Sequence, residues 1–153
     1  MDEEELKKAE RIALKMLVFR DRSEQEVRQK LVREGISASV IEKIVTKLFD
    51  YGYLDDQKFA QQLALSLLKS KQWGFIKIGA TLKARGLSSE LVKKTIYKLK
   101  ENYSEEETAR RIMKRRFPHF KPQGASLKEK QRVVQFFQRR GFSWETIYRV
   151  LMI

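Results

Sequence analysis

The residues of this 153-residue chain that could carry out catalytic chemistry are few. The chain has one histidine, His119, which stands between Pro118 and Phe120 with no serine–acid arrangement beside it. It has no cysteine, which excludes a thiol nucleophile, a thiolate metal site and a disulfide. The motifs GxxxxGK(S/T), GxGxxG and HExxH are absent as well. We therefore expect no catalytic residue, no cofactor and no metal ligand, and we predict that the protein is not an enzyme.

One pair of carboxylates stands in a conspicuous loop, at Asp55 and Asp56. Paired carboxylates can hold Mg²⁺ or transfer protons. A helix is predicted to begin directly after this pair, and acidic residues at a helix start accept hydrogen bonds from its free N–H groups. We therefore interpret Asp55 or Asp56 as the cap of that helix rather than as a metal or catalytic site.

The strongest chemical signal is positive charge, because the net charge is +13 and it is unevenly distributed. Residues 1–68 hold 12 Lys/Arg and 13 Asp/Glu, residues 69–103 hold 9 and 2, and residues 104–153 hold 12 and 5. The first part is thus near neutral and the rest is strongly basic. This indicates a polyanionic partner, which could be nucleic acid, a nucleoprotein or an acidic protein surface. The alternative is that these cations only solvate helix faces.

Basic residues interleave with aromatic ones near Trp73 and Phe75, a pattern that can follow a phosphate backbone or stack on bases. Further clusters follow in the last third of the chain. The aromatic residues of these stretches can also serve the core, which we favour over a stacking role. The candidate residues for binding a polyanionic partner are Lys69, Lys71, Lys77, Lys83, Arg85, Lys93, Lys94, Arg110, Arg111, Lys114, Arg115, Arg116, Arg139, Arg140 and Arg149.

The elements that must position these residues follow from a pattern that occurs three times, centred on Gly35, Gly86 and Gly141. Apolar residues stand eight and four positions before each glycine and one, six and ten positions after it, and a serine stands two after it. Apolar residues four apart share one helix face. The glycine permits a left-handed turn, and the serine can cap the next helix. The pattern predicts three repeated helix–turn–helix pairs.

A further amphipathic segment precedes each pair, at about 3–19, 56–73 and 104–117. We therefore predict an all-α fold of three tandem three-helix repeats, which resemble helix-turn-helix units. The predicted limits are 1–53 for a near-neutral repeat, and 54–103 and 104–153 for two basic ones. A mixed fold with strands at 75–78 or 133–137 is the alternative.

The chain lacks an apolar run long enough to span a bilayer, and its first residues lack the basic-then-apolar order of a signal peptide. We therefore expect a cytoplasmic protein without membrane contact, and we expect a monomer. From the residues alone, a stand-alone DNA-binding protein that uses helix-turn-helix units is one candidate function. A scaffold for an acidic protein is another.

Three groups of residues together resemble the RecX family, whose members regulate the RecA recombinase. They are Arg20-Asp21-Arg22-Ser23-Glu24 leading into Lys30-Leu31 and Gly35, then Gly52-Tyr53-Leu54-Asp55-Asp56 with Phe59-Ala60, then Ile78–Leu82 with Gly86-Leu87. The C-terminal third is similar mainly in its helical repeat and basic character. The residues matched to the family, with mainly structural roles, are Arg22, Ser23, Gly35, Gly52, Tyr53, Leu54, Asp55, Asp56, Phe59 and Gly86.

The resemblance implies an elongated, curved array of the three modules that binds the groove of the RecA–DNA filament. It further implies that binding limits filament extension, ATP hydrolysis and strand exchange. The expected partners are then RecA and single- or double-stranded DNA. The near-neutral first module would suit phosphate less well than the two basic modules.

Overall fold

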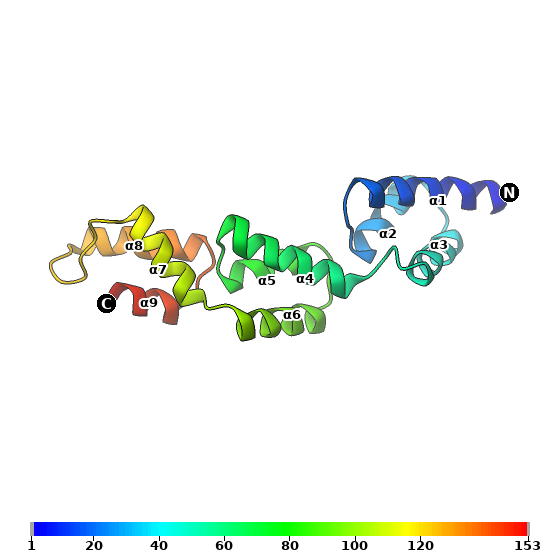
Figure 1. The fold of residues 1–153 in the computed structure, drawn as a ribbon. Coiled ribbons are helices and arrows are strands. Elements are labelled where there is room, and N and C mark those ends of the chain that lie inside the picture. Colours follow the sequence, from blue (N-terminus) through cyan, green and yellow to red (C-terminus); the bar gives the residue numbers. More distant parts are fainter. Residues whose placement is uncertain (1, 153) are drawn as a thin grey trace.

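The computed structural model describes residues 2–152, which form nine α-helices and no strand. Figure 1 shows the helices as three groups that follow one another in an elongated row, with the two ends of the chain at opposite ends. The all-α fold of three tandem three-helix repeats is thus confirmed, and strands at 75–78 or 133–137 are wrong for this part of the chain. No helix in the described range is long and apolar enough to cross a bilayer.

We call the three groups modules 1, 2 and 3. Module 1 comprises α1 (Asp2–Phe19), α2 (Glu24–Arg33) and α3 (Ala38–Asp50). Module 2 comprises α4 (Asp56–Ser66), the π-helical turn η1 (Leu67–Lys71), α5 (Phe75–Ala84) and α6 (Ser89–Asn102). Module 3 comprises α7 (Glu105–Arg116), α8 (Leu127–Arg139) and α9 (Trp144–Met152).

Each module buries a hydrophobic core of its own. The apolar residue four positions before each turn glycine is fully buried in all three modules, as Leu31, Leu82 and Phe137. In module 2 the positions six and ten after the glycine, Val92 and Ile96, are only half-buried. Separate cores mean that the relative placement of the modules depends on the contacts between them.

Serine caps account for most helix starts. Ser23 and Glu26 form a complete capping box at α2, and Ser88, Ser104 and Ser126 each accept a backbone N–H through the side-chain oxygen. The prediction for Ser37 is wrong, since its side chain makes no capping bond. Its backbone N–H instead donates to the carboxylate of Glu5 at 2.6 Å, which pins the turn to α1.

The fourth helix does not run regularly to Trp73. It changes from α-helical to π-helical at Leu67, and Gln72 then ends it in the left-handed conformation at φ 55°. Gln72 is the one non-glycine residue with positive φ in the described range. The wider π turn places Lys69, Lys71 and Gln72 at the end of module 2 that faces module 3.

Two joints hold the array together, and they repeat the same geometry. In each, the turn glycine of one module lies against the first turn of the second helix of the preceding module. At the first joint Ser23 Oγ donates to the carbonyl of Arg85 at 2.6 Å. At the second, the N–H of Gly74 donates to the carbonyl of Arg140 at 2.7 Å, and that of Ile76 donates to Gly141 at 3.1 Å.

A carboxylate completes each joint from the first residue of the following module. Asp56 Oδ1 accepts the backbone N–H of Glu24 at 2.8 Å, and Glu105 Oε1 accepts that of Phe75 at 3.0 Å. Both N–H groups lie at a helix start, where the helix itself offers no acceptor. The capping role expected for the acidic pair is therefore divided: Asp55 caps α4 through the N–H of Lys58, and Asp56 serves the joint.

The second joint is packed too closely for side chains. A Cβ added to Gly141, whose φ is +83°, would lie 2.2 Å from the Cβ and 2.5 Å from the backbone nitrogen of Lys77. A Cβ added to Gly74 would lie 2.3 Å from the carbonyl oxygen of Gly141. By contrast, Gly35 has φ +79° with nothing within 4 Å of an added Cβ.

Comparison of Gly35→Ala with Gly141→Ala therefore distinguishes two causes of lost stability, which are strain in the backbone and steric overlap at the joint. We expect Gly35→Ala to lower the free energy of unfolding by about 1–2 kcal/mol, the cost of the left-handed conformation. Gly141→Ala should cost clearly more, because it must also displace the backbone of module 2. Urea unfolding followed by circular dichroism measures both losses, and equal losses would show that the joint is not tight.

Candidate polyanion-binding surface

Most of the predicted basic residues lie on the surface, but they fall into separate groups. Four of the fifteen, Lys77, Arg85, Arg110 and Arg140, are half-buried, and the others are exposed. The exposed cations come from the end of module 2, from α6, from α7 and from the end of α8. The fifteen predicted basic residues therefore do not form one continuous site.

The densest group lies at the second joint, where residues from η1, α7 and the α8 turn converge. The guanidinium of Arg140 reaches the carbonyl of Lys71 at 3.4 Å, and that of Arg115 reaches the side-chain oxygen of Gln72. Arg116 and Arg140 both lie against the ring of Phe136, at 5.0 and 4.6 Å from its centroid. Burial, and then the nearby Arg116 and Arg115, lower the pKa of Arg140.

We call Lys71, Arg115, Arg116 and Arg140 the joint cluster. Within residues 2–152, none of these four side chains forms an ion pair with a carboxylate. The guanidinium groups of Arg115, Arg116 and Arg140 repel one another, so an anion beside them would lower their electrostatic energy.

A second group surrounds an apolar groove on α5 and α6 of about 370 Å³. Its floor includes Ile76 and Val92, and three of its lining residues are Lys83, Lys93 and Lys100. Sequence reasoning selected the first two lysines but missed Lys100, although the spacing of Lys93, Ile96 and Lys100 on one helix face was available. The exposed Lys94 lies on the same helix but does not line the groove.

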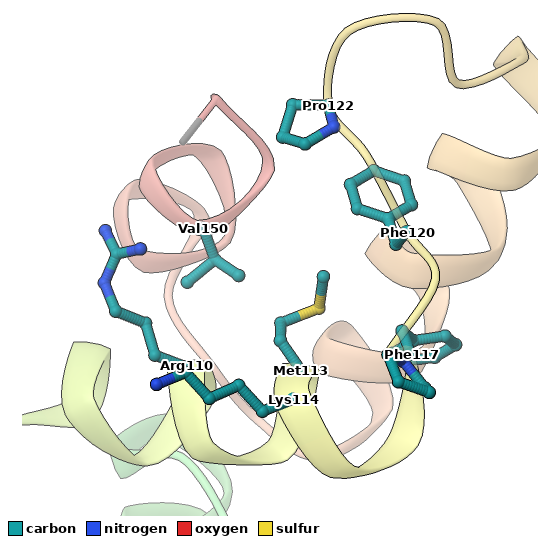
Figure 2. Close-up of a pocket in the computed structure, with 8 residues that line it drawn as sticks. Arg110, Met113, Lys114, Phe117, Phe120, Pro122 and Val150 are labelled. Atoms are coloured by element: carbon teal, nitrogen blue, oxygen red, sulfur yellow. The ribbon is translucent and has the colours of Figure 1, made fainter.

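In module 3, Arg110 and Arg149 share the carboxylate of Glu106, at 3.4 and 3.8 Å. Arg110 also lines a hollow of about 280 Å³ with Lys114 on the same helix. Figure 2 shows Phe120 and Pro122 of the loop facing Met113 and Val150 across this hollow, with Arg110 beside Val150. Arg111 and Arg139 are exposed outside it.

Arg85 belongs to the first joint rather than to an open basic face. Its Nε lies 3.5 Å from Glu26 Oε2, and its guanidinium carbon lies 5.7 Å from the centroid of the Phe59 ring. Glu26 also pairs with Arg20 at 3.3 Å. Arg85 thus shares the carboxylate of Glu26 with Arg20, and its Nη1 is buried without a hydrogen-bond partner within residues 2–152.

The residues that carry the family resemblance hold turns, helix starts and the first joint. Arg22 Nε donates to the carbonyl of Met16 at 3.3 Å, and Ser23 is fully buried in the joint. Leu54 closes the core of module 1, whereas Tyr53 is 56% exposed. Gly35, Gly52 and Gly86 all have positive φ. No group of three His, Asp or Glu residues that could hold a metal occurs in the described part of the chain.

Comparison with known proteins matches the three modules one after another. Models of the first, second and third three-helix domains of RecX match residues 9–48, 55–96 and 104–151. The regulatory protein RecX of Syntrophotalea carbinolica is 31% identical over 137 residues, which cover 90% of each chain. The chain belongs to the RecX family. RecX of Trichlorobacter lovleyi is 30% identical over 135 residues, which cover 88% of each chain.

Solved RecX structures share the fold. The crystal structure of RecX from Lactobacillus salivarius superposes with a TM-score of 0.82 at 19% identity, covering 97% of this chain and 95% of that one. RecX of Bacillus subtilis is 32% identical over 146 residues, but the match covers only 54% of that longer protein. The region that matches this chain therefore also occurs within a longer RecX protein.

Asp56 at the first joint gives a prediction for the pH dependence of stability. Burial raises the pKa of Asp56, the N–H of Glu24 opposes this rise, and the carboxylates of Glu24, Asp55 and Glu26 add to it. A raised pKa in the folded state means that stability from this group is full at low pH and is lost as pH rises through that pKa.

Asp56→Asn keeps an oxygen acceptor for Glu24 but removes the charge. We expect it to gain stability relative to the natural protein as pH rises from the ordinary carboxyl pKa through the raised pKa of Asp56. Asp56→Ala lacks the acceptor and should cost about 1 kcal/mol across the whole range. Thermal unfolding of the three proteins at several pH values tests this, and parallel curves for Asp56→Asn and the natural protein would contradict it.

Proposed function

We propose that this protein regulates RecA without catalysing a reaction itself, by binding the RecA–DNA filament and limiting its extension, ATP hydrolysis and strand exchange. Family membership supports a regulatory role. The observation that carries the proposal is the uneven surface of the array: modules 2 and 3 carry uncompensated cations, whereas module 1 is near neutral. A filament of protein and DNA offers phosphate groups that complement the basic modules and protein surface that a near-neutral module can contact.

Module 1 supports this interpretation through its apolar residues. Val18 and Phe19 at the end of α1 are more than 80% exposed, and Val32, Tyr51 and Tyr53 are also well exposed. Exposed aromatic and aliphatic residues are typical of protein–protein interfaces, whereas uncompensated arginines are typical of nucleic-acid interfaces. We propose that module 1 contacts RecA and that modules 2 and 3 extend along the DNA-bearing groove.

The stand-alone DNA-binding function is the second candidate, and α6 favours it. This helix follows the turn of its module, as a recognition helix does, and it exposes Lys93, Lys94, Lys98 and Tyr97. Salt-sensitive binding to naked DNA, unchanged by RecA, would support this function over the first.

The proposed function is tested by titrating the protein into RecA that hydrolyses ATP on single-stranded DNA in large excess. The excess prevents sequestration of DNA from imitating inhibition. We expect ATP hydrolysis to fall at well below one copy per RecA, because one bound copy blocks extension of a whole filament. No change, at a salt concentration where the protein binds naked DNA, would favour the second candidate.

Charge reversal tests which surface contacts the filament. The double variant Arg115→Glu/Arg116→Glu should weaken filament binding on the order of tenfold, because two contacts to phosphate or carboxylate become repulsive. Lys83→Glu should also weaken it, and this variant leaves the first joint intact, unlike a change at Arg85. Binding is measured by anisotropy of labelled filaments, with circular dichroism to verify helicity.

The matched control is Lys7→Glu/Lys8→Glu on α1, which changes the net charge by the same amount. Both lysines are exposed in the first half of α1, whereas the apolar residues of this helix that we assign to RecA contact, Val18 and Phe19, stand at its end. If the control variant and the Arg115/Arg116 variant lose affinity equally, the effect is one of total charge and not of a site.

A further inference from the structure

The two joints are alike in backbone and opposite in charge. Counted from the turn glycines Gly35 and Gly86, Glu26 and Lys77 both stand nine positions earlier, in the first turn of α2 and α5. On the other side of each joint, Arg85 and Arg140 stand directly before the glycine of the following module. The first joint therefore pairs an arginine with a glutamate, and the second has an arginine and a lysine at the corresponding positions.

The side-chain contacts differ between the two joints because glutamate in the first is replaced by lysine in the second. Arg85 turns to Glu26 and forms an ion pair at 3.5 Å. Arg140 has no such partner, and its guanidinium extends instead to the carbonyl of Lys71 and the face of Phe136. There it meets Arg116, which lies against the same ring. Lys77 places its ammonium over Trp73 at 4.1 Å and donates to the carbonyl of Arg139 at 3.3 Å.

Part of this arrangement has a structural role. Arg115 and Arg116 lie in the last turn of α7, where cations interact favourably with the helix dipole. Arg140 stands at the C-cap of α8, where the dipole of that helix also favours a cation, but neither dipole requires the three guanidinium groups to come together. The same backbone joint forms at the first position with an arginine–glutamate ion pair, so the cluster of unpaired cations is not required for the joint to form.

We propose that the second joint is a phosphate-binding site for a nucleic-acid strand, with Arg116 and Arg140 as its central ligands and Arg115 and Lys71 beside them. The site deepens the function proposed above and rests on it, since the DNA of a nucleoprotein filament is the strand it would meet. Planar guanidinium groups bind phosphate oxygens through two parallel hydrogen bonds. Because the ligands come from modules 2 and 3, a bound strand would also hold the two modules together.

The surroundings favour nucleic acid over an acidic protein. One well-exposed large apolar residue, Ile76 in the first turn of α5, lies at this joint, and none lies in η1, in α7 or in the last turn of α8. A protein interface has an apolar centre depleted of charge, whereas a nucleic-acid interface is polar and strongly positive. The joint cluster matches the second description.

The internal comparison supplies the test. Lys77→Glu offers Arg140 the carboxylate that Arg85 has at the first joint, and so should draw its guanidinium away from the cluster while the joint stays folded. Lys128→Glu, on the exposed start of α8, makes the same change in net charge away from the joint. Lys77→Met removes the cation over Trp73 without adding an anion. Comparison with Lys77→Glu therefore distinguishes the effect of losing that contact from the effect of the new ion pair with Arg140.

Binding to a labelled single-stranded oligonucleotide is measured by anisotropy over a series of salt concentrations, with a thermal melt of each variant. We expect Lys77→Glu to bind at least about tenfold more weakly than the natural protein and to melt no lower. If Arg140 leaves the strand, the slope of log K against log salt should fall by about 0.7. Lys128→Glu and Lys77→Met should both stay near the natural protein, because neither offers Arg140 a carboxylate.

Three outcomes would overturn the site. Equal affinities of Lys77→Glu and Lys128→Glu would make the cluster structural. Normal binding of Lys77→Glu to naked DNA with weaker binding to RecA–DNA filaments would assign the joint to an acidic protein surface. Absence of DNA binding by the natural protein at low salt would exclude the site, while inhibition of RecA would leave the proposed function standing. Conversely, joint-dependent DNA binding without any effect on RecA would retain the site and remove that function.

Discussion

The array depends on one interaction that occurs twice: a carboxylate that reaches back across a joint to the start of a helix in the preceding module. Asp56 does this for α2 and Glu105 does it for α5. Glu105 is 8% exposed, and its other oxygen accepts from the backbone and hydroxyl of Ser143 and from the hydroxyl of Thr146. A buried carboxylate is tolerated only when its oxygens are hydrogen-bonded, and here one oxygen holds the start of α5 and the other holds the start of α9. One side chain thus links two modules and the α9 start.

The bridging carboxylates explain why modules with separate cores have a defined arrangement relative to one another. Modules with independent cores could take many relative orientations if only a flexible linker joined them. The short connection at 51–55, the turn glycine and the bridging carboxylate leave the first joint little freedom, and the second joint adds glycines on both sides of the contact. Fixed modules keep binding groups at fixed spacing, which raises the effective concentration of the second group once the first has bound.

The sequence predicted the repeat well because each repeated residue has a local physical reason. Leu31, Leu82 and Phe137 occur in the pattern because they lie on one apolar helix face, and they are buried on that face in the structure. The joints were not predicted, because they depend on residues far apart in the chain. A signal was present: Glu5, Asp56 and Glu105 each precede a buried alanine by four positions, at Ala9, Ala60 and Ala109. The predicted limits of the modules, and the roles of the basic residues in binding, stay predictions.

The third module shows how local sequence decides whether a joint can form. Counted from Gly141, the positions of the first-joint residues Ser23 and Glu24 correspond to Glu129 and Lys130. Both lie inside α8, which begins at Leu127 under the cap of Ser126, and the N–H of Lys130 already donates to the carbonyl of Ser126. A helix start that is one turn longer thus occupies the space in which a further turn glycine would dock, and it consumes the N–H group that a bridging carboxylate would need. A serine caps both α2 and α8. The cap of α2 leaves the N–H of Glu24 free for a carboxylate of the next module. The cap of α8 stands three residues earlier relative to the turn glycine, so the N–H at the equivalent position is already bonded within the helix.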